Sequence, residues 1–279
     1  MDFDKIVKKL SRKPGFPIGL DDLAEYVDPG YARGAEGKRD TYKLAYRLKA
    51  ENVLLPIRNG LFLVRPDSAP GESGTGRIRR EEESRAMQDI RLIEDAYWRI
   101  VKKIVTTRCG SSYLIGGPKS LEIRMRDLSI PDTLIVYTRH DPGTVAVADR
   151  RKIVFKTVAS GGKTGRTNAF PHFAKLAETF EIDGAKFKVA CAEHAVLDSL
   201  TVHKGMPEPD EYAVMKFLSK YAKTLRREVL GTLVSFKYLK AVNRLREIAR
   251  DRGGMSGLYE KALDVVKREG GNCFVSSGK

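Results

Sequence analysis

The feature that most constrains the fold is a two-residue turn, Asn59-Gly60, between the apolar runs 53–57 and 61–64. Asn-Gly favours a tight hairpin because both central residues take positive φ, which glycine adopts freely and asparagine tolerates. The hairpin directly follows a basic stretch, residues 36–52, that has the periodicity of a helix. A basic helix followed at once by a short hairpin is the order of elements in a winged helix-turn-helix, where the helix enters the DNA major groove.

Two short helices are predicted ahead of the basic one, over residues 3–13 and 21–27. Pro14-Gly15 ends the first helix, and Asp28-Pro29-Gly30 ends the second. We therefore predict a winged helix-turn-helix domain over residues 1–66.

The predicted DNA-facing residues are cationic or aromatic and lie on or beside the basic helix. Its inner face is supplied by Leu44, Ala45 and Leu48, so the cations fall on the opposite half. Arg33 precedes the helix in the turn that would face phosphate, and Arg58 lies beside the hairpin turn. The full set is Arg33, Lys38, Arg39, Tyr42, Lys43, Arg47 and Arg58.

Composition supports a polyanionic partner. A formal net charge of +15 in 31.2 kDa, with a pI near 9.7, is most often explained by nucleic acid. The three cysteines, Cys109, Cys191 and Cys273, fit neither a metal spacing nor a disulfide framework. The sequence has no apolar run of 18 residues, and its start lacks the pattern of a signal peptide. We expect a cytoplasmic protein that does not engage a membrane.

Residues 67–80 are rich in proline, glycine and serine and are predicted to be a linker to a second domain, residues 81–279. Strands in the middle of this domain and helices at both ends indicate an α+β fold with a central sheet and C-terminal helices. The predicted strands are 112–115, 133–137, 144–148 and 152–158. The predicted helices are 82–107, 119–125, 190–203, 210–227, 230–250 and 256–269.

Two glycine-containing stretches are candidate nucleotide sites, and both motifs are incomplete. Gly162-Lys163-Thr164 follows a strand, but Thr157 stands where a phosphate-binding loop needs its first glycine. Gly116-Gly117 followed by Asp127 is the order found in nucleotidyltransferases, whose two-metal chemistry needs a second carboxylate close by. Leu128-Ser129 follows Asp127 instead, so Gly116-Gly117 is better explained as a strand-to-helix turn.

A nuclease-like pattern is also incomplete. Asp132 and Asp149 could supply carboxylates, but Arg151 would occupy the position of the base and stays protonated. The histidines lie in different predicted elements and are expected to be isolated surface or capping residues. They are His140, His172, His194 and His203. We therefore expect no catalytic residue, no metal site and no cofactor.

A second basic face is predicted on the helix 230–250. Lys237, Lys240 and Arg244 recur at helical spacing, away from the apolar side of that helix. The apolar side consists of Leu233, Leu239, Val242 and Leu245.

Three segments, in this order, resemble the AbiEi family of abortive-infection type IV antitoxins. They are residues 55–64, which close the predicted hairpin, residues 113–123 with the Gly116-Gly117 turn, and residues 187–198. In the third segment the family usually has proline before the glutamate and a basic residue after it, whereas this chain has Ala192 and His194 around Glu193.

The resemblance implies a cytoplasmic transcriptional autorepressor that binds operator repeats in double-stranded DNA at its own promoter. It also implies a C-terminal domain that antagonises a nucleotidyltransferase-like toxin encoded beside it, for which direct contact is not required. Lys237, Lys240 and Arg244 are the candidate antitoxin surface. Two alternatives remain: a DNA-targeted nuclease or nucleotidyltransferase, and a DNA-binding adaptor without antitoxin activity.

Overall fold

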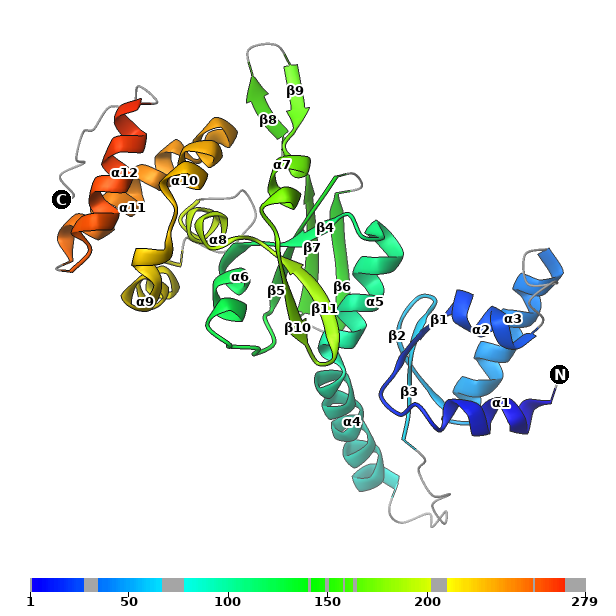
Figure 1. Cartoon of the computed structure of the whole chain (residues 1–279). Coiled ribbons are helices and arrows are strands. Elements are labelled where there is room, and N and C mark those ends of the chain that lie inside the picture. Colours follow the sequence, from blue (N-terminus) through cyan, green and yellow to red (C-terminus); the bar gives the residue numbers. More distant parts are fainter. Residues whose placement is uncertain are drawn as a thin grey trace. The chain divides into compact units, whose positions relative to one another are not determined.

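The computed structural model describes residues 2–27, 35–66, 78–139, 142–148, 151–157, 159–162, 165–201, 210–252 and 254–268. Its backbone groups into two compact units, residues 1–107 with 146–152 and residues 108–145 with 153–279. The predicted linker lies largely outside the described residues, and the domain boundaries around it stay a prediction. Figure 1 shows the elements of each unit.

The N-terminal elements of the first unit combine helices with an antiparallel sheet in the order β1-β3-β2. Their core is aliphatic, with Leu10, Leu23 and Leu48 fully buried. The inner face predicted for the basic helix is confirmed, because Leu44, Ala45 and Leu48 are all buried. The elements are α1 (Phe3–Leu10), β1 (Pro17–Gly19), α2 (Leu20–Val27), α3 (Ala35–Ala50), β2 (Leu54–Arg58) and β3 (Leu61–Val64).

The predicted hairpin forms, but its turn differs from the expected one. Arg58 pairs with Leu61 across Asn59-Gly60, and the register shifts between Pro56 and Arg58. Gly60 has φ +74°, whereas Asn59 is not among the residues with positive φ. The expectation that both central residues take positive φ was therefore wrong. The register shift in β2, of the kind that a β-bulge produces, lies directly before this turn.

The predicted helix 82–107 is two helices, α4 (Ile78–Asp95) and α5 (Tyr97–Cys109). Ala96, a buried residue, lies between the two helices, and its N–H bonds to the carbonyl of Leu92. Ion pairs join these helices to the N-terminal elements. Lys103 Nζ lies 2.6 Å from Asp22 Oδ2, and Arg65 Nη1 lies 2.7 Å from Asp89 Oδ1.

A six-stranded mixed sheet has the strand order β10-β11-β4-β5-β7-β6, and most of its residues belong to the second unit. Its β11–β4 pair is parallel, while β10–β11 and β4–β5 are antiparallel. Together with the C-terminal helices this gives the predicted α+β class. The strands are β4 (Tyr113–Ile115), β5 (Thr133–Thr138), β6 (Gly143–Ala148), β7 (Arg151–Thr157), β10 (Glu178–Ile182) and β11 (Ala185–Val189).

Two hairpins of this unit were not predicted, β8 (Ala159–Gly162) with β9 (Gly165–Asn168), and β10 with β11. The second had a clear sequence signal, the pair Asp183-Gly184. Both of its residues have positive φ, +49° and +69°, as a mirror-image hairpin turn requires. The tight turn predicted at Asn59-Gly60 is thus realised here instead.

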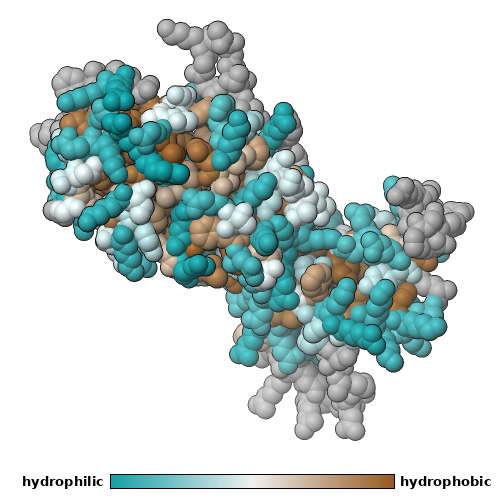
Figure 2. Space-filling model, in the orientation of Figure 1, coloured by the Kyte–Doolittle hydropathy of each residue, from teal (hydrophilic) through white to brown (hydrophobic). Residues whose placement is uncertain are grey.

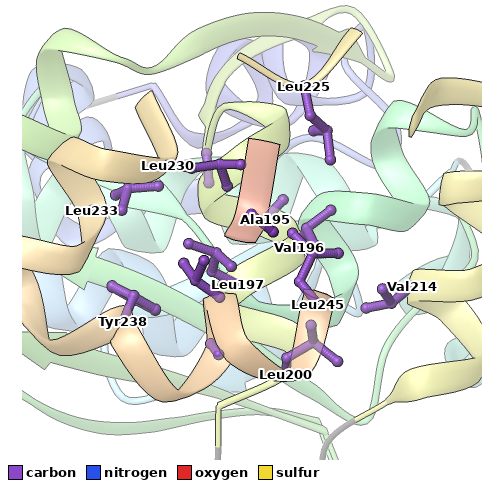
Figure 3. Close-up of a cluster of buried hydrophobic side chains, with 14 of the residues drawn as sticks. Ala195, Val196, Leu197, Leu200, Val214, Leu225, Leu230, Leu233, Tyr238 and Leu245 are labelled. Atoms are coloured by element: carbon purple, nitrogen blue, oxygen red, sulfur yellow. The ribbon is translucent and has the colours of Figure 1, made fainter. Parts of the chain in front are cut away.

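Helices meet on a common apolar core in the C-terminal part, shown in Figure 3, where Val196, Leu197, Leu230 and Leu245 approach one another. The predicted helix 230–250 is wrong as a single element, since π-helical turns over Val234–Tyr238 interrupt it. The helices of this unit are α6 (Gly117–Arg124), α7 (Phe170–Lys175), α8 (Ala192–Ser199), α9 (Glu211–Tyr221), α10 (Arg227–Leu233), α11 (Leu239–Asp251) and α12 (Ser256–Arg268). A 3-10 turn, Ala222–Thr224, follows α9.

Candidate nucleic-acid interface

Helix α3 presents one cationic face to solvent. Thr41, Leu44, Ala45 and Leu48 are buried, and the exposed residues occupy the other side. The exposed side comprises Lys38, Arg39, Tyr42, Lys43, Tyr46, Arg47 and Lys49. Every predicted DNA-facing residue of α3 is therefore exposed. Tyr46 and Lys49 share this face but were not predicted as site residues. Hydrophilic side chains also cover most of the α1–α3 region seen in Figure 2.

The charges on α3 differ in how far they are already paired. Lys43 Nζ lies 2.9 Å from Asp40 Oδ1, in an exposed pair that water weakens. The Arg47 guanidinium stacks 3.8 Å from the centre of the Phe3 ring, which holds its position while leaving it exposed. Within the described residues, Lys38, Arg39 and Lys49 have no acidic partner. These three are the most available cations on the helix.

The hairpin carries a further exposed cation, Arg58. Arg58 ends β2, is exposed, and lies directly before the turn at Asn59-Gly60. A Cβ added to Gly60 would lie 3.2 Å from Leu20 Cδ1, so the turn packs closely against the start of α2. The remaining predicted cation, Arg33, lies outside the described residues.

A cationic face on α1 was missed at the sequence level. Lys5, Lys8 and Lys9 are exposed, as is Arg12 just after the helix, while Ile6 and Leu10 are buried. Their spacing of three and four residues is the signal that could have found them. Because Phe3 contacts Arg47, the first turn of α1 adjoins α3. The N-terminal elements thus carry exposed cations on α1, α3 and the hairpin, and on α1 Lys5 is already paired, with Nζ 3.1 Å from Asp2 Oδ2.

The second basic face predicted for the C-terminal helices is not continuous. Lys237 lies in the π-helical segment with φ +74°, outside the helical register of Lys240. Arg244 is already engaged, with Nε 2.7 Å from Glu211 Oε1 and Nη1 3.2 Å from Glu247 Oε2. The predicted face requires an uninterrupted helix from Lys237 to Arg244. The π-helical segment takes Lys237 out of that helical spacing, although its side chain is still exposed. Of the three predicted residues, only Lys240 is exposed on α11 and makes no ion pair among the described residues.

The Gly116-Gly117 turn connects β4 to α6, as predicted, and its space is filled from within the protein. The Gly117 N–H donates to Asp198 Oδ2 at 2.6 Å, and the Tyr137 hydroxyl donates to Asp198 Oδ1 at 2.5 Å. Side chains at either glycine would collide with Tyr137 or Ile135. A phosphate at this turn would need the N–H that Asp198 already holds and the space that Tyr137 occupies.

His194 is buried, contrary to the expectation of an isolated surface or capping residue. Its Nε2 lies 3.0 Å from the Tyr238 hydroxyl, which donates to Asp198 Oδ1 at 3.1 Å. Burial and the Asp198 charge raise the pKa values of Tyr137 and Tyr238 well above normal, so both hydroxyls keep their protons. The hydrogen bonds of this cluster link β5, α8 and the π-helical segment. This structural role accounts for the burial of His194 without a catalytic or binding role.

Glu193, next to it, is also buried and binds Arg226. Its Oε1 accepts from the Arg226 backbone N–H at 2.8 Å and from Nε at 2.9 Å, and its Oε2 accepts from Nη2 at 3.1 Å. Burial acts to raise the pKa of Glu193, but the hydrogen bonds and charge of Arg226 outweigh it and leave that pKa below the usual value. Burial raises the pKa of the neighbouring Cys191 thiol to about 12.

Other classes of site find no support in the part of the chain that the structure describes. There, no three histidine, cysteine or acidic side chains gather to hold a metal ion. No described helix combines the length and apolar character needed to cross a membrane.

No protein-family model matches the chain, and a comparison with curated proteins finds none that is significantly similar.

Proposed function

We propose that this protein is a DNA-binding transcriptional regulator whose residues 1–66 act as a winged helix-turn-helix. In this proposal α3 is the recognition helix, the β2–β3 hairpin is the wing, and Arg58 contacts backbone phosphate. The observation that carries it is the solvent face of α3, where five Lys or Arg side chains are exposed and the acidic Asp40 is partly exposed. Such a face beside a hairpin fits the major groove and flanking phosphates of duplex DNA.

The α1 cations extend the same proposal. Phosphate contacts by Lys and Arg supply much of the affinity for DNA and make it depend on salt. Exposed Lys8 and Arg12 have no acidic partner among the described residues, so they are available for such contacts. The formal net charge of +15 favours the same class of partner.

We further propose that the chain is a cytoplasmic autorepressor and antitoxin of the AbiEi kind, which antagonises a neighbouring nucleotidyltransferase-like toxin with or without direct contact. The three ordered segments described above are its support. The filled Gly116-Gly117 turn favours this proposal over a nucleotidyltransferase, because an enzyme of that class needs the turn open to a nucleotide. The missing second carboxylate near Asp127 argues the same way.

The experiment is a binding titration of the full chain on a labelled duplex from upstream of its own gene, over a series of salt concentrations. Changing Arg39 and Lys43 together to alanine should weaken binding by about 1–3 kcal/mol for each side chain that reads a base edge. If they contact only phosphate, the log–log salt slope should become shallower by about 0.9 per contact. Lys216→Ala with Lys220→Ala on α9 is the matched control, and both of these lysines are exposed.

Equal affinity of the Arg39/Lys43 variant and the wild type would contradict the assignment of α3. A control variant that weakens binding as much would show a diffuse charge effect instead. The antitoxin proposal is tested separately, by co-expressing the chain with the neighbouring gene product and measuring growth. Toxicity that the chain does not relieve would leave a DNA-binding adaptor.

A further inference from the structure

Two large rings lie on the exposed face of α3. Tyr42 is 61% exposed and Tyr46 is 75% exposed. They are four residues apart, so they lie one above the other on the helix surface. A face that needed only solubility would carry lysine or glutamate at these positions. Exposed rings side by side mark a surface that contacts something apolar.

The rings lie inside the cationic face and not at its edge. Viewed down the helix at about 100° per residue, Tyr46 lies between Tyr42 and Lys43, and Arg39 is on the same line two turns earlier. Lys49 and Arg47 flank this strip on opposite sides, and all of these residues are exposed. The centre of the face is therefore partly aromatic, and its rim is cationic.

This arrangement matches the major groove, where phosphates line both walls and base edges form the floor. Thymine alone presents a methyl group there, and an apolar side chain contacts it favourably. We propose that Tyr42 and Tyr46 pack on thymine methyl groups and so determine the operator preference of this protein. The inference rests on the proposed function, because it requires α3 to be the recognition helix.

Aromatic rings among cations also bind single strands by stacking on bases. The duplex is favoured here because the rings stand on a regular helix with a hairpin beside it, a shape that fits a groove. Single-stranded binding is nevertheless a distinct outcome of the test.

The test first selects the preferred duplex from random DNA with the full chain. Each thymine of that duplex is then replaced by deoxyuridine, which removes only the methyl group. At one or two positions we expect the wild type to lose about fourfold in affinity, the ratio for one buried methyl group. Tyr46→Ala or Tyr42→Ala should bind thymine and uracil equally there, while Tyr46→Phe should still distinguish them.

The matched control is Tyr212→Ala on α9, because Tyr212 is as exposed as Tyr46, at 75%. It should keep the full methyl effect, and all variants should melt near the wild type because these rings are exposed. The inference is overturned if no thymine methyl matters to the wild type, or if the alanine variants keep the same methyl dependence. Binding to single strands but to no duplex would overturn the proposed function itself.

Discussion

Replacing Arg226 should lower the free energy of unfolding, because the buried carboxylate of Glu193 loses its charged partner. Glu193 is 1% exposed and receives its hydrogen bonds from Arg226, two from the side chain and one from the backbone. Arg226→Met removes the two side-chain bonds and the charge but leaves the backbone N–H. Breaking a buried pair from one side costs about 3–5 kcal/mol. Because the Arg226 side chain is 55% exposed and one bond survives, we expect a smaller loss than this, about 2–3 kcal/mol after allowing for solvent screening.

The loss of stability in Arg226→Met should be larger near neutral pH than in acid. In the wild type the folded pKa of Glu193 is lowered, so the pair stabilises the fold above the ordinary glutamate pKa, about 4.3, and the benefit disappears as pH falls through the lowered value. In Arg226→Met, burial is opposed only by the backbone hydrogen bonds to the carboxylate, so the pKa of Glu193 should rise above its wild-type value. The variant should therefore be most destabilised near neutral pH and approach the wild type in acid, where Glu193 is protonated in both proteins.

The assay is urea unfolding of both proteins, followed by circular dichroism, from pH 7 down to the acid limit of the fold. Arg227→Met is the matched control, since Arg227 pairs with Asp264 at 3.3 Å on the surface and should cost less than about 0.5 kcal/mol. A loss in Arg226→Met that stays constant with pH would refute the electrostatic explanation and assign the effect to packing.

Three further changes test local features. Gly60→Val should destabilise the protein by about 1–3 kcal/mol, measured by urea unfolding, because a β-branched residue is strained at φ +74°. Lys237→Gly should stabilise the protein by about 0.5–1 kcal/mol, because glycine adopts the φ of +74° at this position without strain. Lys240→Gly, in the regular helix α11, should instead destabilise the protein by about 1 kcal/mol, and the same sign for both changes would contradict this reasoning. Cys191 is buried with a pKa near 12 and should react with a thiol reagent at pH 8 much more slowly than the half-buried Cys109, and equal rates would show that the core opens readily.

The faces of α3 could be predicted from the sequence because exposure along one helix follows local periodicity. Leu44 and Leu48 are buried and Arg39 and Lys43 are exposed, as the pattern indicated. The exposure of Tyr46 follows from the same periodicity, because it lies four residues after Tyr42.

Features that depend on residues far apart in the chain could not be predicted. Asp198 bonds to Gly117, Tyr137 and Tyr238, each of which lies 40 to 81 positions from Asp198 in the chain. Nothing in the sequence near His194 shows that Tyr238 will cover it. The interruption of the helix at Lys237 could not be predicted either, because the apolar spacing in the sequence continues through it. The change is in the backbone φ and ψ angles.

The central claim is that α3 enters the major groove of duplex DNA, and chemical protection tests it most directly. Dimethyl sulfate methylates guanine N7 in the major groove and adenine N3 in the minor groove, so it reports which groove a protein occupies. With the full chain on the duplex from upstream of its own gene, we expect protection of guanine N7 within the bound segment. That protection should be lost in the variant with alanine at Arg39 and Lys43. Protection confined to adenine N3, or N7 protection that persists in that variant, would contradict the claim.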